Sequence, residues 1–101
     1  MAEYITRNSN NSNGRYRSKI QIIGKILEIA ANRGGYGTTK NRIMYGASLS
    51  YEQLEGYLEL LIENDLLSYD KQTRTFKIVE KGILFLQVFN EIDEILKEDH
   101  C

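Results

Sequence analysis

The sequence predicts a mainly helical domain with one small β-hairpin, in the order helix, helix, helix, hairpin, long helix. Apolar residues recur at helical spacing in three segments, near 18–33, 50–64 and 81–98. Two of these segments begin with a serine that is followed three residues later by a glutamine, which is the pattern of a capping box. Two short alternating runs joined by a polar turn lie between the third helix and the last.

Length and composition indicate one globular domain. The chain has 101 residues, of which 42% are hydrophobic and 27% charged. No apolar run approaches the roughly 20 residues that cross a bilayer, and residues 1–14 lack the apolar core of a signal peptide, so we expect a cytoplasmic protein without membrane contact. We predict a flexible polar tail at 1–14, a helix–hairpin domain at 15–80 and a C-terminal dimerisation helix at 81–101.

The first helix is expected to begin after Ser18, with Gln21 as the reciprocal capping residue. Its apolar residues form two adjoining stripes: Ile20, Ile23, Leu27 and Ala30, and Ile22, Ile26 and Ile29. The apolar arc is therefore wide, and the helix should be buried on more than one side. Glycines at 34–35 supply its left-handed end.

A short helix, a turn and a longer helix follow. Thr38 or Thr39 caps a helix from Lys40 to about Tyr45, and residues 46–49 form a tight turn. Ser50 caps a third helix that runs to about Asn64, with Gln53 at its capping-box position. This outline is typical of a helix-turn-helix.

The hairpin is predicted at Leu66–Tyr69 and Arg74–Val79, with residues 70–73 as its turn. Three helices followed by a β-hairpin make a winged helix. The predicted fold class is therefore a winged helix-turn-helix with an added C-terminal helix.

The last helix carries more apolar residues than one neighbour can cover. Phe85, Val88, Ile92 and Ile95 follow the 3-4-3 spacing of a coiled-coil seam. Packing against the first helix explains some of the apolar arc, and a second copy of the chain is expected to cover the remainder. The predicted dimer interface consists of Phe85, Val88, Phe89, Ile92, Ile95 and Leu96.

Charge is divided unevenly along the chain, although the total is only −1. Residues 1–49 hold eight basic and two acidic side chains, whereas residues 50–101 hold five basic and twelve acidic ones. Such an asymmetry indicates one side that faces a polyanion and one acidic side.

The sequence argues against an enzyme. His100, the only histidine, lies at the terminus, so no triad and no histidine-containing zinc site is available. The glycines at 34–37 lack the ending of a phosphate-binding loop, and the acidic residues at 91–99 are expected to form a solvated face. Cys101 is expected to be a free terminal thiol, with an intermolecular disulfide as the less favoured alternative. We expect no metal, cofactor or small-molecule ligand.

Two segments resemble the archaeal winged-helix DNA-binding proteins of the 10a family. They are residues 38–67, which include Arg42-Ile43-Met44-Tyr45 and Leu49-Ser50-Tyr51, and residues 79–82. The resemblance covers about residues 17–98. It implies a winged helix whose C-terminal helix forms an antiparallel coiled-coil dimer. It also implies binding to duplex DNA with modest sequence preference, in a chromatin-organising or regulatory role.

The predicted DNA contacts avoid most of the third helix, because Glu52, Glu55, Glu59 and Glu63 make its polar face acidic. Its first turn is the exception, since the positive end of the helix dipole lies there. The candidates at this end are Ser48, Ser50, Tyr51 and Gln53. Gln53 is either a base-edge contact or only a capping residue. The predicted phosphate contacts, expected to converge on one side of the domain, are Arg15, Arg17, Lys19, Lys40, Arg42, Lys71 and Arg74.

These observations predict a homodimer that binds double-stranded DNA, associated with the nucleoid, as chromatin architecture or as a transcription regulator. The acidic third helix allows an alternative, a winged helix that binds another protein and not DNA. The basic first half favours the DNA-binding hypothesis, because a protein-binding module does not need it.

Overall fold

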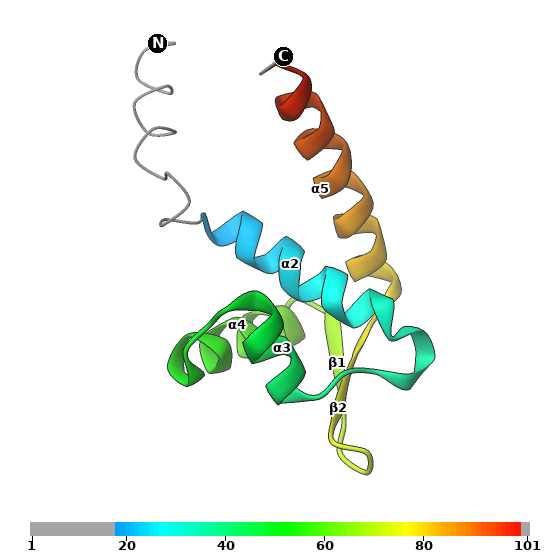
Figure 1. Cartoon of the computed structure of the whole chain (residues 1–101). Helices are drawn as coiled ribbons and strands as arrows, with labels where there is room; N and C mark the ends of the chain where they lie inside the picture. The colour runs from blue at the N-terminus through cyan, green and yellow to red at the C-terminus, as the bar shows by residue number, and fades with distance from the viewer. Residues whose placement is uncertain (1–17, 100–101) are drawn as a thin grey trace.

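The structure is a computed structural model that describes residues 18–99 and confirms the predicted winged helix (Figure 1). Its elements in chain order are α2 (Lys19–Asn32), the 3-10 turn η1 (Gly34–Tyr36), α3 (Lys40–Ala47), α4 (Tyr51–Glu63), β1 (Leu67–Asp70), β2 (Thr75–Ile78) and α5 (Glu80–Asp99). The predicted tail at 1–14 and Cys101 lie outside the described residues.

Both predicted capping boxes are formed. At the start of α2, the backbone N–H of Gln21 donates to Ser18 Oγ at 3.2 Å, and the N–H of Ser18 donates to Gln21 Oε1 at 3.1 Å. Ser50 and Gln53 repeat this exchange at the start of α4, at 3.1 and 3.0 Å. Each box satisfies two backbone donors that the first turn would leave without a partner, which fixes where these helices begin.

The helix-turn-helix turn differs from the prediction, because α3 continues through Ala47 and the turn is made by Ser48. Ser48 has a left-handed backbone (φ 56°), and the N–H of Leu49 donates to the Met44 carbonyl at 3.0 Å. A left-handed residue followed by this long-range bond is a Schellman motif. Leu49 is buried directly after it. Burial of a leucine contributes about 1.5–3 kcal/mol, enough to offset the roughly 1–2 kcal/mol that a left-handed residue costs.

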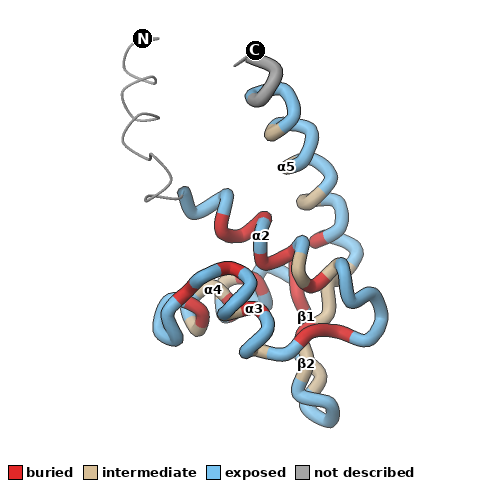
Figure 2. Tube along the Cα trace, viewed as in Figure 1, coloured by how far each residue is buried: buried red, intermediate tan, exposed pale blue. Residues whose placement is uncertain are grey.

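The core lies where α2 meets α3, α4 and the base of the hairpin (Figure 2). The largest apolar side chains that are essentially inaccessible to solvent are Ile26, Leu27, Ile43, Leu54, Leu61 and Leu67. They come from four different elements, so α2 is buried on more than one side, as its wide apolar arc predicted.

β1 lies one residue later than predicted, β2 is shorter than predicted by one residue at each end, and a third segment pairs with β2. β1 and β2 pair antiparallel with Leu67 opposite Ile78 and Tyr69 opposite Phe76. Thr38, which precedes α3, exchanges two backbone hydrogen bonds with Phe76, at 2.8 and 2.7 Å. The connection between α2 and α3 is thereby held on the outer edge of β2.

The first half of the last helix, α5, packs on α2, and the helix then extends away from the other elements (Figure 1). Phe89 lies against Gly24, where a Cβ would be 2.7 Å from Phe89 Cε2. Phe85 and Phe89 are therefore partly buried within one chain. Part of the apolar arc of α5 is covered by this intramolecular packing. Among residues 18–99, no helix combines the length and the apolar character needed to cross a membrane.

Two helical glycines provide a matched test of how closely the start of α5 packs against the backbone of Leu66. A Cβ at Gly82 would collide with the carbonyl oxygen of Leu66, which is backbone and has little freedom to move, whereas a Cβ at Gly56 would meet nothing. We expect Gly56→Ala to raise the free energy of unfolding by about 0.5–1 kcal/mol through helix propensity. We expect Gly82→Ala to lower it by about 1–3 kcal/mol because of overpacking. Urea denaturation followed by circular dichroism measures both, and a stabilised Gly82→Ala variant would contradict this packing.

Candidate nucleic-acid interface

The first turn of α4 is exposed. The side chain of Tyr51 is 59% accessible, and Ser50, Glu52 and Gln53 are exposed beside it. The capping box occupies Oε1 of Gln53 and confirms its capping role. The Nε2 donor of Gln53 takes no part in the cap, so a base contact by the same side chain stays compatible with capping.

An ion pair joins α3 to α4 beside this turn. Lys40 Nζ lies 2.6 Å from Glu55 Oε2 and 5.3 Å from the centroid of the Tyr51 ring. The hydrogen bond from Lys40, followed by one involving Tyr51, holds the pKa of Glu55 below its usual value. The hydrogen bond to Glu55 raises the pKa of Lys40 in turn. Both side chains are therefore charged at neutral pH, and the predicted phosphate contact Lys40 already has an anionic partner.

The outer face of α4 is acidic, as the sequence predicted, with Glu52, Glu59 and Glu63 exposed. Between α4 and the hairpin lies an open groove of about 510 Å³, and Lys40, Glu55 and Glu59 contribute its charged side chains. The remaining lining residues are Leu58, Ile62, Tyr69 and Phe76. This face would repel a phosphate backbone along most of the helix, which leaves the first turn, at the positive end of the helix dipole, as the end compatible with an anion.

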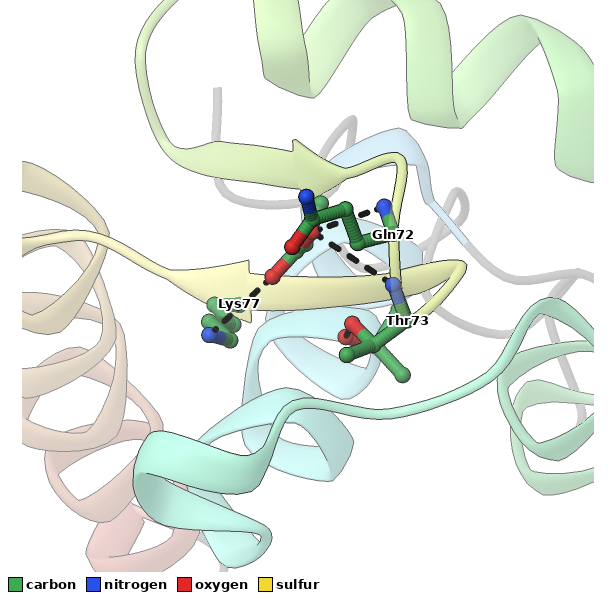
Figure 3. Close-up of polar contacts among 5 residues, drawn as sticks. Gln72, Thr73 and Lys77 are labelled. Atoms are coloured by element: carbon green, nitrogen blue, oxygen red, sulfur yellow. Dashed lines mark hydrogen bonds and ion pairs between the residues drawn. The ribbon is translucent and has the colours of Figure 1, made fainter.

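The wing is ordered by Asp70. Its Oδ1 accepts hydrogen bonds from the backbone N–H groups of Gln72 at 2.9 Å and Thr73 at 3.4 Å, and its Oδ2 lies 3.6 Å from Lys77 Nζ (Figure 3). The N–H of Gln72 contributes most to holding the pKa of Asp70 below its usual value. Arg74 closes the turn with a left-handed backbone (φ 58°).

The structure brings together some of the predicted contact residues and separates others. Lys40 lies beside the first turn of α4, and the exposed Lys71 and Arg74 stand on the wing, which the Thr38–Phe76 bonds tie to the start of α3. The first turn of α2, which carries Lys19, lies at the other end of the domain from the wing tip (Figure 1). Lys19 is therefore separated from the predicted wing contacts Lys71 and Arg74. Arg15 and Arg17 lie outside the described residues.

The residues predicted for a dimer interface fall into two groups. Val88, Ile92, Ile95 and Leu96 are each more than half exposed, whereas Phe85 and Phe89 are partly buried against the same chain. All of them except Ile95 line an apolar groove of about 300 Å³ between α5 and the start of α2, to which Ile20 also contributes.

Comparison with known proteins decides the family. A family model described as winged helix-turn-helix matches residues 16–97, most of the chain. The chain belongs to the winged helix-turn-helix family. Membership identifies it as a non-enzymatic protein, as the sequence predicted.

An uncharacterized protein of Methanocaldococcus jannaschii, MJ0287, is 32% identical over 90 residues, which are 88% of each chain. A second one from this organism, MJ0290, is 29% identical over 83 residues, and the match spans 37% of its length.

Solved structures agree with this assignment. The chain is similar to Sso10a-2, a DNA-binding protein from Sulfolobus solfataricus, with a TM-score of 0.68, 25% identity and coverage of 83% of this chain and 86% of that one. This likeness confirms the resemblance to the archaeal 10a proteins. An S. aureus MepR mutant bound to an oligodeoxyribonucleotide shares the fold, with a TM-score of 0.63, 17% identity and coverage of 98% and 80%.

The contacts of Asp70 make the stability of the wing depend on pH. Because its folded-state pKa is depressed, Asp70 stabilises the protein above its unfolded-state pKa, and this contribution is lost as pH falls through the folded-state value. We expect Asp70→Asn, which keeps the turn acceptor but not the charge, to be less stable than wild type at neutral pH. The difference should close in acid, when measured by urea denaturation at several pH values.

Asp70→Ala serves as the comparison, because alanine removes the acceptor as well as the charge. It should be less stable than Asp70→Asn at neutral pH. A gap between wild type and Asp70→Asn that stays constant from neutral pH to acid would contradict the assigned role.

Proposed function

We propose that this protein binds double-stranded DNA as a homodimer with weak sequence preference. The observation that carries the proposal is the exposed, capped first turn of α4 within a winged helix-turn-helix domain. The likeness to Sso10a-2, described as a DNA-binding protein, supports it at 25% identity.

The charge distribution favours contact through the end of α4 and not along it. Glu59 and Glu63, exposed beyond the first turn, would face the phosphates if the helix lay lengthwise in a groove, whereas Glu52 lies in the first turn itself. With its end in the groove, the helix offers its positive dipole end, the Tyr51 ring and the amide of Gln53. Most of the affinity then comes from phosphate contacts by α3 and the wing, which carry little sequence information.

The exposed apolar face of α5 supports a dimer. Four side chains that are each more than half exposed, Val88, Ile92, Ile95 and Leu96, lie on a helix that extends beyond the domain (Figure 1). A contiguous apolar face of this kind on a small protein is typical of an interaction site. An antiparallel pairing of two α5 helices would cover it and place the two winged helices at opposite ends.

A dimer with a DNA-binding domain at each end is able to join two duplexes, which favours a role in chromatin organisation on the nucleoid. Regulation of transcription at particular sites uses the same contacts and is the second form of this proposal. Footprinting and force measurements on long DNA distinguish the two roles. Discrete protected sites would indicate regulation, and continuous coating or bridging would indicate chromatin organisation.

Duplex binding should be steeply dependent on salt. If about five to seven phosphates are neutralised, the logarithm of the affinity should fall with the logarithm of salt concentration with a slope of about −4 to −6. Fluorescence anisotropy with a labelled random duplex measures this slope. The absence of binding at low salt would favour a protein-interaction module, to which the acidic face of α4 is suited.

Arg74→Gly is the sharpest variant for this assay. Glycine adopts the left-handed backbone of residue 74 without strain, so the free energy of unfolding should change by no more than about 1 kcal/mol. The salt slope should become shallower by about 0.9 for each Arg74 that contacts a phosphate. Lys25→Gln removes the same charge from the exposed side of α2 and should leave the slope unchanged.

The dimer is tested by Ile92→Glu, which places a charge in the proposed interface. Light scattering at micromolar concentration should report twice the chain mass of 11.7 kDa for wild type and a shift toward the monomer for the variant. Because Ile92 is 52% exposed in one chain, the variant should keep its helical circular dichroism. Glu91→Gln changes the adjacent exposed residue and should remain dimeric. A monomeric wild-type protein would remove both the dimer and the bridging role.

A further inference from the structure

The ion pair between Lys40 and Glu55 lies within the surface that we propose for DNA. It joins the first residue of α3 to the first half of α4, over 15 residues of sequence, with 2.6 Å between Lys40 Nζ and Glu55 Oε2. The two side chains are 39% and 46% exposed, so an approaching anion can reach both.

Glu55 differs from the other carboxylates of α4 in having a cationic partner. Within residues 18–99, no ion pair joins Glu52, Glu59 or Glu63 to a basic side chain. Glu55 also keeps its charge at neutral pH, because Lys40 and Tyr51 lower its pKa.

This geometry changes what Lys40 offers to an anion. A phosphate that approaches the ammonium group meets the carboxylate at nearly the same distance, so attraction by one largely cancels repulsion by the other. The ammonium group must then leave Glu55 or be shared with it.

From this we infer that Glu55 competes with a DNA phosphate for Lys40, so that the pair limits both the affinity of the domain for duplex DNA and its salt dependence. The inference rests on the proposed function. Tyr51 belongs to the same unit, because the Lys40 ammonium group lies over its ring at 5.3 Å. When Lys40 turns to a phosphate, the contact that orients Tyr51 at the start of α4 changes with it.

The test compares two substitutions that each remove one negative charge from α4. Glu55→Gln frees Lys40, and we expect duplex affinity at low salt to rise about fivefold, with a salt slope steeper by about 0.9, the value for one more neutralised phosphate. Glu59→Gln, one turn further along the exposed face, should raise the affinity less than about twofold and leave the slope unchanged.

A double-mutant cycle with Lys40→Gln separates release of the lysine from simple removal of charge. Lys40→Gln alone should weaken binding only slightly, because Lys40 is already paired. In the Glu55→Gln background the same change should remove the whole gain. Glu55→Ala, which removes the hydrogen-bond acceptor as well, should repeat the result of Glu55→Gln.

The outcomes are distinguishable. An equal gain from Glu55→Gln with and without Lys40, or a gain no larger than that of Glu59→Gln, overturns the competition. Failure of wild type and every variant to bind duplex at low salt overturns the proposed function itself. Circular dichroism melting of each variant verifies that the affinities are compared between folded proteins.

Discussion

The fold depends on the burial of α2 from several directions at once. Ile26 and Leu27 are wholly inaccessible, and the helix contacts α3, β2 and α5. A helix with one apolar stripe would accept a single covering layer, whereas this one must be enclosed by both the helix-turn-helix and the hairpin. The close approach of Phe89 to Gly24 then directs α5 away from the domain. The positions of the candidate DNA-binding surface and of the exposed apolar helix both follow from this arrangement.

Much of the fold could be predicted because its signals are local. The capping boxes at Ser18 and Ser50 each involve residues three apart, and the hairpin turn and the apolar periodicities have similarly short range. The end of α4 was predicted to within one residue, whereas the end of α3 lies two residues beyond its prediction. Both use a non-glycine residue in a left-handed conformation, Ser48 and Asp65, which sequence reasoning does not expect outside glycine and asparagine. In both cases a buried leucine follows, and that pattern of a polar residue before a leucine was the available signal.

The general position of the candidate site was predicted from the sequence, but the ion pair between Lys40 and Glu55 was not. The acidity of α4 and the exposure of its first turn are visible in the sequence, because they depend on the period of one helix. The contact of Lys40 with Glu55 depends on how α3 crosses α4, and a separation of 15 residues carries no local signal. Similarly, the predicted convergence of phosphate contacts placed Lys19 with the wing residues, although the first turn of α2 and the wing tip lie at opposite ends of the domain (Figure 1). Composition counts charges, whereas only the fold determines which of them lie together.

The bonds between Thr38 and Phe76 have a mechanical consequence. They join the backbone two residues before Lys40 to the middle of β2, so the hairpin and the start of α3 share one hydrogen-bonded frame. A wing attached only through its own two strands would be free to swing, but here any such rotation must break both bonds or carry α3 with it. The wing is therefore rigidly connected to the helix-turn-helix. A force applied at the wing tip is transmitted to α3, the helix that carries Lys40 and Arg42.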